Sequence, residues 1–184
     1  MEFGFWQVTS AVLVPGVLVA SWIDFSQRRV PNWLNLSLIV LGFMVQAVFF
    51  GWAGIRDGGL GLLTGFGLLI IPWLMRAMGA GDVKLMAAIG VFMGPWLTFV
   101  SFSLGAVIGG IVAVIMTVST GRLRMAYANL GLIMVKMSSP QTMFSDFAST
   151  KSLGSSSMLL PYGVPLSAGT LIILAATVFG WWGM

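Results

Sequence analysis

The chain has 184 residues, of which 58% are hydrophobic and 8% are charged, and its mean hydropathy is +1.00. This composition excludes an ordinary soluble domain and predicts an integral membrane protein. The chain has no cysteine and no histidine, which excludes disulfides, a thiol nucleophile, a histidine base and the usual zinc sites. We therefore expect no metal and no cofactor. The net charge of +4 is typical of basic loops that orient a lipid-embedded chain, so we expect the lipid bilayer as a partner and no nucleic acid.

Uncharged windows predict the membrane spans. One helical crossing needs about 20 residues. Three windows without a charge are 21, 23 and 18 residues long: residues 3–23, 33–55 and 58–75. Each therefore predicts one helix, and Arg56 and Asp57 are expected in a short outer loop between the last two.

A fourth uncharged window, residues 85–121, is 37 residues long and too long for one crossing. Gly94-Pro95 is the expected turn within it. The remaining helices are therefore predicted from about 82 to 94, from about 96 to 120, and within 152–184.

The basic residues test this count because each crossing reverses the side of everything downstream. Six crossings place eight of the nine basic residues on the side of Arg28 and only Arg56 on the other, whereas five crossings divide them four to five. We therefore predict one all-α, polytopic domain over 1–184, with six transmembrane helices and both termini outside. Residues 121–157 are expected in the cytoplasm. Within them, residues 123–137 fit either a helix on the membrane surface or a solvated loop.

Two of the five acidic residues lie where a predicted helix meets a cytoplasmic loop. Asp24 ends the first span and Asp82 opens the fourth, so both lie on the same side of the membrane. An ionisable group at the hydrocarbon boundary is costly and indicates a functional site. The structural alternative is that Asp24 pairs with Arg28 at i+4 and that Asp82 caps the helix it opens.

The residues around Asp82 form a Gly-x-Gly-Asp motif, Gly79-Ala80-Gly81-Asp82, at the start of a helix. Two glycines leave room for an extended substrate backbone to approach the carboxylate. Lys84, two residues later, is either an anchor at a helix end or a group that binds a substrate carboxylate or favours an ionised aspartate.

The segment after Asp24 reads Phe25-Ser26-Gln27-Arg28-Arg29-Val30-Pro31-Asn32. Pro31 stops the first helix, and the turn at Pro31-Asn32 starts the second.

Together these segments resemble the type IV prepilin peptidases, a branch of the Gly-x-Gly-Asp intramembrane aspartyl proteases. The resemblance extends from about Trp22 to Gly169. It rests on the segment from Asp24 to Asn32, the motif with Lys84, and a later patch, Pro161-Tyr162-Gly163.

The resemblance implies that Asp24 and Asp82 are catalytic and that the other motif residues bind substrate or support the site. It also implies a prepilin substrate, with a short basic leader and a hydrophobic helix, cleaved at the cytoplasmic face of the inner membrane. Pilus assembly proteins are a further implied partner. With no cysteine or histidine present, we expect a water held between the two carboxyl groups to be the nucleophile. Like-charge repulsion would keep one carboxyl protonated and the other ionised as general base.

Many bacterial members of that family carry paired Cys-x-x-Cys motifs in an N-terminal insertion and also methylate the new N-terminus. This chain has no cysteine and 23 residues before Asp24, so it looks like the short, peptidase-only form associated with Flp or tight-adherence pili. Methyl transfer is not expected. Three alternatives stay open: an archaeal preflagellin-type peptidase, another Gly-x-Gly-Asp protease of the signal-peptide-peptidase or presenilin type, and a non-enzymatic ion-coupled carrier or assembly subunit.

Overall fold

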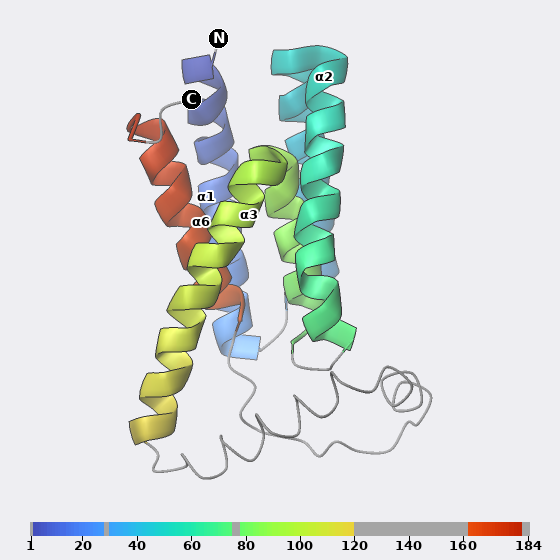
Figure 1. Cartoon of the computed structure of the whole chain (residues 1–184). Helices are drawn as coiled ribbons and strands as arrows, with labels where there is room; N and C mark the ends of the chain where they lie inside the picture. The colour runs from blue at the N-terminus through green and yellow to red at the C-terminus, as the bar shows by residue number, and fades with distance from the viewer. Residues whose placement is uncertain (1, 28–29, 75–77, 120–161, 182–184) are drawn as a thin grey trace.

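The computed structural model describes residues 2–27, 30–74, 78–119 and 162–181, whose regular secondary structure is entirely helical (Figure 1). The prediction of an all-α protein is therefore confirmed. The predicted cytoplasmic segment 121–157 lies outside the described residues. The helices are α1 (Glu2–Gln27), α2 (Asn32–Leu74), α3 (Ala80–Ser119) and α6 (Gly163–Val178).

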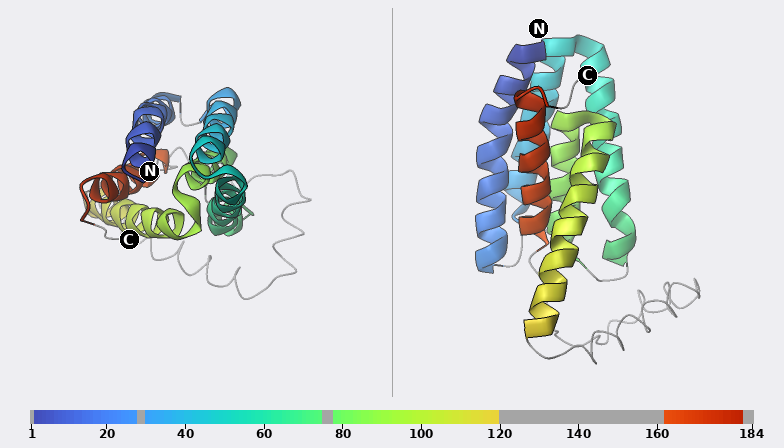
Figure 2. Two further views of the ribbon diagram at one scale, coloured as in Figure 1. Left: turned by 90° about the horizontal axis from the view of Figure 1, so that it is seen from above. Right: turned by 60° about the vertical axis from the view of Figure 1, so that its left-hand side comes forward.

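Helices α2 and α3 each reverse direction at a glycine with a positive φ. The backbone φ angle is 58° at Gly51 and 70° at Gly94, in the left-handed region that residues other than glycine rarely adopt. Pro95 follows Gly94 and suits the first position of a new helical arm, because its missing N–H has no partner to lose there. Each of these helices consequently has two arms that run in opposite directions; the arms of α2 lie side by side, whereas those of α3 spread apart from the turn (Figures 1 and 2). The predicted turn at Gly94-Pro95 is confirmed.

The reversal of α2 does not fall where the charges predicted it. Arg56 and Asp57 were expected in a loop, but the structure includes both in the second arm of α2 and exposes their side chains. Gly51 makes the turn instead. The two arms of α2 are in contact directly after this turn, because a Cβ added at Gly54 would overlap the carbonyl of Gln46, eight residues earlier. Reversal needs an unusual φ, which a glycine supplies, whereas long charged side chains near a helix end can reach water without a loop.

Three of the described helical segments are long and apolar enough to cross a membrane: Gly4–Gln27, Asn32–Leu74 and Ala80–Met116. The apolar segment Gly163–Val178 is shorter. The count of six transmembrane helices stays a prediction. In the first arm of α3, 80–93 are 14 residues, or about 21 Å at ~1.5 Å per residue, which is short of a ~30 Å hydrocarbon core. Accordingly, the turn of α3 lies deeper in the bundle than the turn of α2 (Figure 1).

The first arm of α3 forms the centre of the bundle. Every residue from Leu85 to Gly94 is buried, whereas a peripheral helix would bury only one face. The second arm of α2 approaches this arm backbone to backbone, because a Cβ added at Gly61 would overlap the Gly90 carbonyl and the reverse is also true. Apolar side chains from the other helices complete the core: Leu13, Val17, Leu38, Leu69, Leu166 and Leu174.

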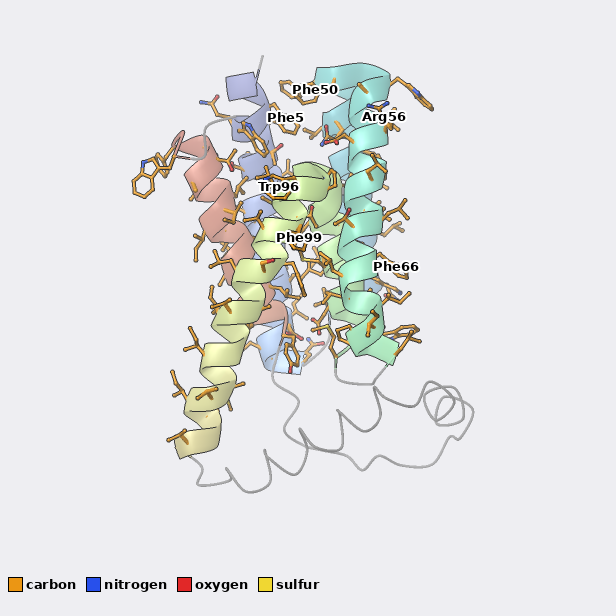
Figure 3. All side chains as sticks on the ribbon, in the orientation of Figure 1. Phe5, Phe50, Arg56, Phe66, Trp96 and Phe99 are labelled. Atoms are coloured by element: carbon orange, nitrogen blue, oxygen red, sulfur yellow. The ribbon has the colours of Figure 1, made fainter. Side chains whose placement is uncertain are left out.

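The outer surface is apolar, with aromatic residues near both ends of the bundle. Val48 is 81% exposed, which would be costly in water and is ordinary against lipid tails. Exposed tryptophans lie near both ends: Trp22 is five residues before the end of α1, and Trp52 directly follows the Gly51 turn at the opposite end, as in the aromatic belts of membrane proteins. At that opposite end, Phe5 packs edge-on against Phe50 with ring centroids 4.9 Å apart (Figure 3). These features identify a membrane protein.

Candidate active site

Asp24 lies in the last turn of α1 and is 3% exposed. The backbone N–H of Gly163, the first residue of α6, donates a hydrogen bond of 3.0 Å to its Oδ2. A Cβ added at Gly163 would lie 2.6 Å from the same oxygen, so only a glycine allows this approach without a shift. The beginning of the last helix therefore holds the carboxyl group at the end of the first.

Asp82 lies in the first turn of α3 and is 6% exposed. Its backbone N–H donates to the carbonyl of Gly79 at 3.2 Å, which closes the turn before the helix. An acidic residue is favourable in the first turn of a helix because the free N–H groups there carry partial positive charge. Gly79 is exposed, and a Cβ added to it would lie 3.5 Å from Oδ2 of Asp82, an ordinary contact.

The two aspartates come together at one end of the bundle. The end of α1 and the beginnings of α3 and α6 lie at the same end in Figure 1. The carboxyl groups of Asp24 and Asp82 are close enough for their charges to interact. Two buried carboxyl groups whose charges interact can share one proton. Among the described residues, no group of three or more His, Cys, Asp or Glu side chains could hold a metal ion.

Gly81 contacts the chain itself rather than open space. A Cβ added there would lie 2.9 Å from the backbone nitrogen of Val30 and 3.1 Å from its carbonyl oxygen. Val30 is buried and precedes α2, so Gly81 allows the connection between α1 and α2 to pack on the turn before Asp82. The expectation that both glycines leave room for substrate is therefore compatible with the contacts of Gly79, while Gly81 has a packing role.

Lys84 and Asn32 hold the same two segments together on the exposed side. Nζ of Lys84, the fifth residue of α3, donates a hydrogen bond of 2.8 Å to Oδ1 of Asn32, the first residue of α2. Pro31 is half-buried, and its carbonyl accepts the N–H of Asn35 at 3.4 Å as α2 begins.

Among the remaining predicted site residues, Tyr162 is half-exposed directly before α6, and its carbonyl accepts the N–H of Leu166 at 3.2 Å. Arg28 and Pro161 lie outside the described residues.

Sequence reasoning missed Asn35, which the structure adds to this group. Asn35 is 1% exposed, and its Nδ2 donates to the Gly81 carbonyl at 3.3 Å. The available signal was a polar amide inside the uncharged window 33–55, since polar groups in membrane helices usually face the protein interior.

Comparisons with known proteins identify the family of the chain. The sequence profile described as the type IV leader peptidase family matches residues 11–114, more than half of the chain. The chain belongs to the type IV leader peptidase family. No solved structure matches it.

Relatives bearing the name prepilin leader peptidase/N-methyltransferase occur in several bacteria. The chain is 32% identical to the protein of Stutzerimonas stutzeri over 125 residues, 62% of this chain and 43% of that protein. It is 36% identical to the protein of Escherichia coli K12 over 102 residues, 52% of this chain and 44% of that protein. It is 30% identical to the protein of Neisseria gonorrhoeae over 132 residues, 64% of this chain and 43% of that protein. The match thus spans less than half the length of these relatives.

Proposed function

We propose that this chain is a membrane-embedded aspartyl endopeptidase that removes the short basic leader from type IV or Flp-type prepilins. The observation that carries the proposal is that two buried carboxyl groups, Asp24 and Asp82, lie at one end of an apolar helical bundle, close enough for their charges to interact. Membership of the leader peptidase family supports peptide hydrolysis as the reaction. The relatives are bacterial prepilin leader peptidases, which favours a prepilin over a preflagellin substrate.

In the proposed mechanism the two carboxyl groups activate one water. The ionised carboxylate removes a proton as the water oxygen attacks the scissile carbonyl carbon, and the protonated partner donates a hydrogen bond to the carbonyl oxygen. Collapse of the tetrahedral intermediate breaks the C–N bond, and a proton passes from the dyad to the leaving amine. Titration belongs to the pair, so the mechanism does not depend on which aspartate is ionised first.

The proposed orientation has six crossings and the aspartates at the cytoplasmic face of the inner membrane. The end of the bundle that carries them also carries Lys84, two residues after Asp82 on α3, and a basic residue is expected on the cytoplasmic side. A prepilin presents its basic leader in the cytoplasm and its hydrophobic helix in the membrane, so its cleavage site reaches this end. Methyl transfer, the second activity in the relatives' names, is not part of the proposal.

Co-expression with a candidate prepilin tests the function directly. The wild-type chain is expected to convert the precursor to a shorter pilin, whose mass locates the cleaved bond, while Asp24→Asn leaves it uncleaved. A non-enzymatic carrier would leave the precursor intact with both chains. That outcome would overturn the proposal.

A further inference from the structure

Asn35 occupies an unusual position for an amide side chain. It lies in the first turn of α2, one residue from Leu34 and three from Leu38, both of which are buried in the hydrophobic core. Its own side chain is 1% exposed. A buried amide is costly unless its donor and acceptor atoms have partners, so its contacts indicate what the group does.

The donor atom of Asn35 has one partner, the carbonyl of Gly81, at 3.3 Å. The chemistry fixes the orientation of the amide, because only its nitrogen can donate to a carbonyl oxygen. Gly81 immediately precedes Asp82, and the Asp82 N–H is bonded to Gly79 in the same turn. Asn35 therefore contacts the peptide that determines where the backbone of Asp82 lies.

The acceptor atom of Asn35 has no hydrogen-bond partner within the described part of the chain. An unsatisfied buried polar atom costs about 1–3 kcal/mol. A leucine has similar size and would avoid that cost on a face already rich in leucine. The stability of the bundle alone therefore does not account for an amide at position 35.

We propose that Asn35 is a positioning residue for Asp82: its amide holds the Gly81 peptide so that the Asp82 carboxyl group stays directed toward Asp24. The inference rests on the proposed function, since it concerns the geometry of the same aspartate pair. Asn35 does not touch the reacting atoms in this account. It acts through the backbone of Gly81.

The chain provides a matched control in Gln46. This residue also lies on α2, is 3% exposed, and donates through Nε2 to the Val91 carbonyl of α3 at 3.0 Å. The two contacts share the same chemistry and join the same two helices. Val91 lies ten residues after Gly81 along α3, about 15 Å away at ~1.5 Å per residue, on the side of the Gly94 turn. A general loss of packing would affect both contacts alike, whereas a positioning role belongs to Asn35 alone.

The experiment compares Asn35→Leu with Gln46→Leu in purified protein, using a prepilin that the wild type cleaves and rates per mole of folded protein. Asn35→Leu is expected to lower kcat about 10- to 100-fold with KM within about twofold, because a displacement near 1 Å at a catalytic group can reduce rates on that scale. Gln46→Leu is expected to keep kcat within about twofold. Asn35→Ala, which removes the donor without adding bulk, provides the same test if the leucine variant does not fold.

Amide hydrogen exchange gives a second readout that does not depend on activity. Asn35→Leu is expected to accelerate exchange at the Asp82 N–H and to leave the segment around Val91 unchanged, while Gln46→Leu does the opposite. Unchanged kcat and unchanged Asp82 exchange in the Asn35 variants would overturn the inference, and so would equal kcat losses in both series. If the wild type cleaves prepilin and either overturning result is observed, the proposed function stands and only the positioning role of Asn35 is rejected. If the wild type cleaves no prepilin, the proposed function is rejected, and hydrogen exchange at the Asp82 N–H then tests the Asn35–Gly81 contact by itself.

Discussion

The backbone N–H of Gly163 hydrogen-bonds Oδ2 of Asp24 at 3.0 Å, although 139 residues separate the two in sequence. The contact links the end of the first helix to the beginning of the last. The first N–H groups of a helix have no partner within that helix, so the N–H of Gly163 is available to hold the carboxyl group in place. The fold therefore couples the placement of α6 to the orientation of one of the two buried aspartates.

Gly163→Ala is expected to reduce cleavage strongly, because its Cβ would lie 2.6 Å from Oδ2 of Asp24 and one of the two must move. Overpacking of this kind typically costs about 1–3 kcal/mol. The measurement is cleavage per mole of folded protein together with the thermal midpoint in detergent. The matched control is Gly67→Ala, where nothing lies within 4 Å of the added methyl, and which is expected to retain activity. Equal activity in the two variants would argue against a role for the Gly163 contact.

Asp24→Asn and Asp82→Asn are each expected to abolish cleavage nearly as completely as the double change. Groups that act together on one water are not additive, and loss of an acid–base residue costs about 10²- to 10⁴-fold in rate. A time course of prepilin processing by the three variants measures this. Asp57→Asn is the control, because Asp57 is exposed and directly follows Arg56, which lies toward the opposite end of the bundle (Figure 3). Additive losses, each moderate, would point to two independent roles.

Several parts of the fold were predictable because they depend on local pattern. The apolar composition specified helices, and Gly94-Pro95 specified a turn that an uncharged window of 37 residues required. The reversal at Gly51 was not predictable in the same way. Gly51 is one of 24 glycines and lies inside an uncharged window, whereas Arg56 and Asp57 gave a stronger but misleading signal of a loop.

In the candidate site, too, the features that depend on local sequence could be predicted, whereas the long-range contacts could not. The Gly-x-Gly-Asp motif and the helix-end position of Asp24 are local, so both aspartates could be chosen from sequence. The contacts of Gly163 with Asp24 and of Asn35 with Gly81 join residues 139 and 46 positions apart. Such contacts depend on how the helices pack, which no short pattern encodes. The packing of Gly81 on Val30 was hidden for the same reason.

The proposed orientation can be tested with single cysteines, because the natural chain has none to remove. Ser26 and Ala53 are both exposed; Ser26 lies in the last turn of α1 and Ala53 lies two residues after the Gly51 turn of α2, which is at the opposite end of the bundle (Figure 1). A membrane-impermeant thiol reagent applied to intact cells is expected to label Ala53→Cys and to spare Ser26→Cys. Permeabilised cells should label both, which controls for accessibility. Labelling of Ser26→Cys from outside would reverse the proposed topology.

The two glycines before Asp82 are expected to respond differently to substitution. Gly81→Val places side-chain atoms against the Val30 backbone, where even a Cβ would lie 2.9 Å from the nitrogen. It should lower the thermal midpoint and the yield of folded protein, with an overpacking cost of about 1–3 kcal/mol. Gly79→Ala meets only Oδ2 of Asp82 at an ordinary 3.5 Å and should fold normally. Any loss of cleavage in Gly79→Ala would then reflect access to the carboxyl group.

Ala80→Ser, between the two glycines, is expected to stay active. A stable but inactive Gly81→Val protein would instead restore a direct role in substrate approach at that position, so activity and thermal midpoint must be measured on the same preparations.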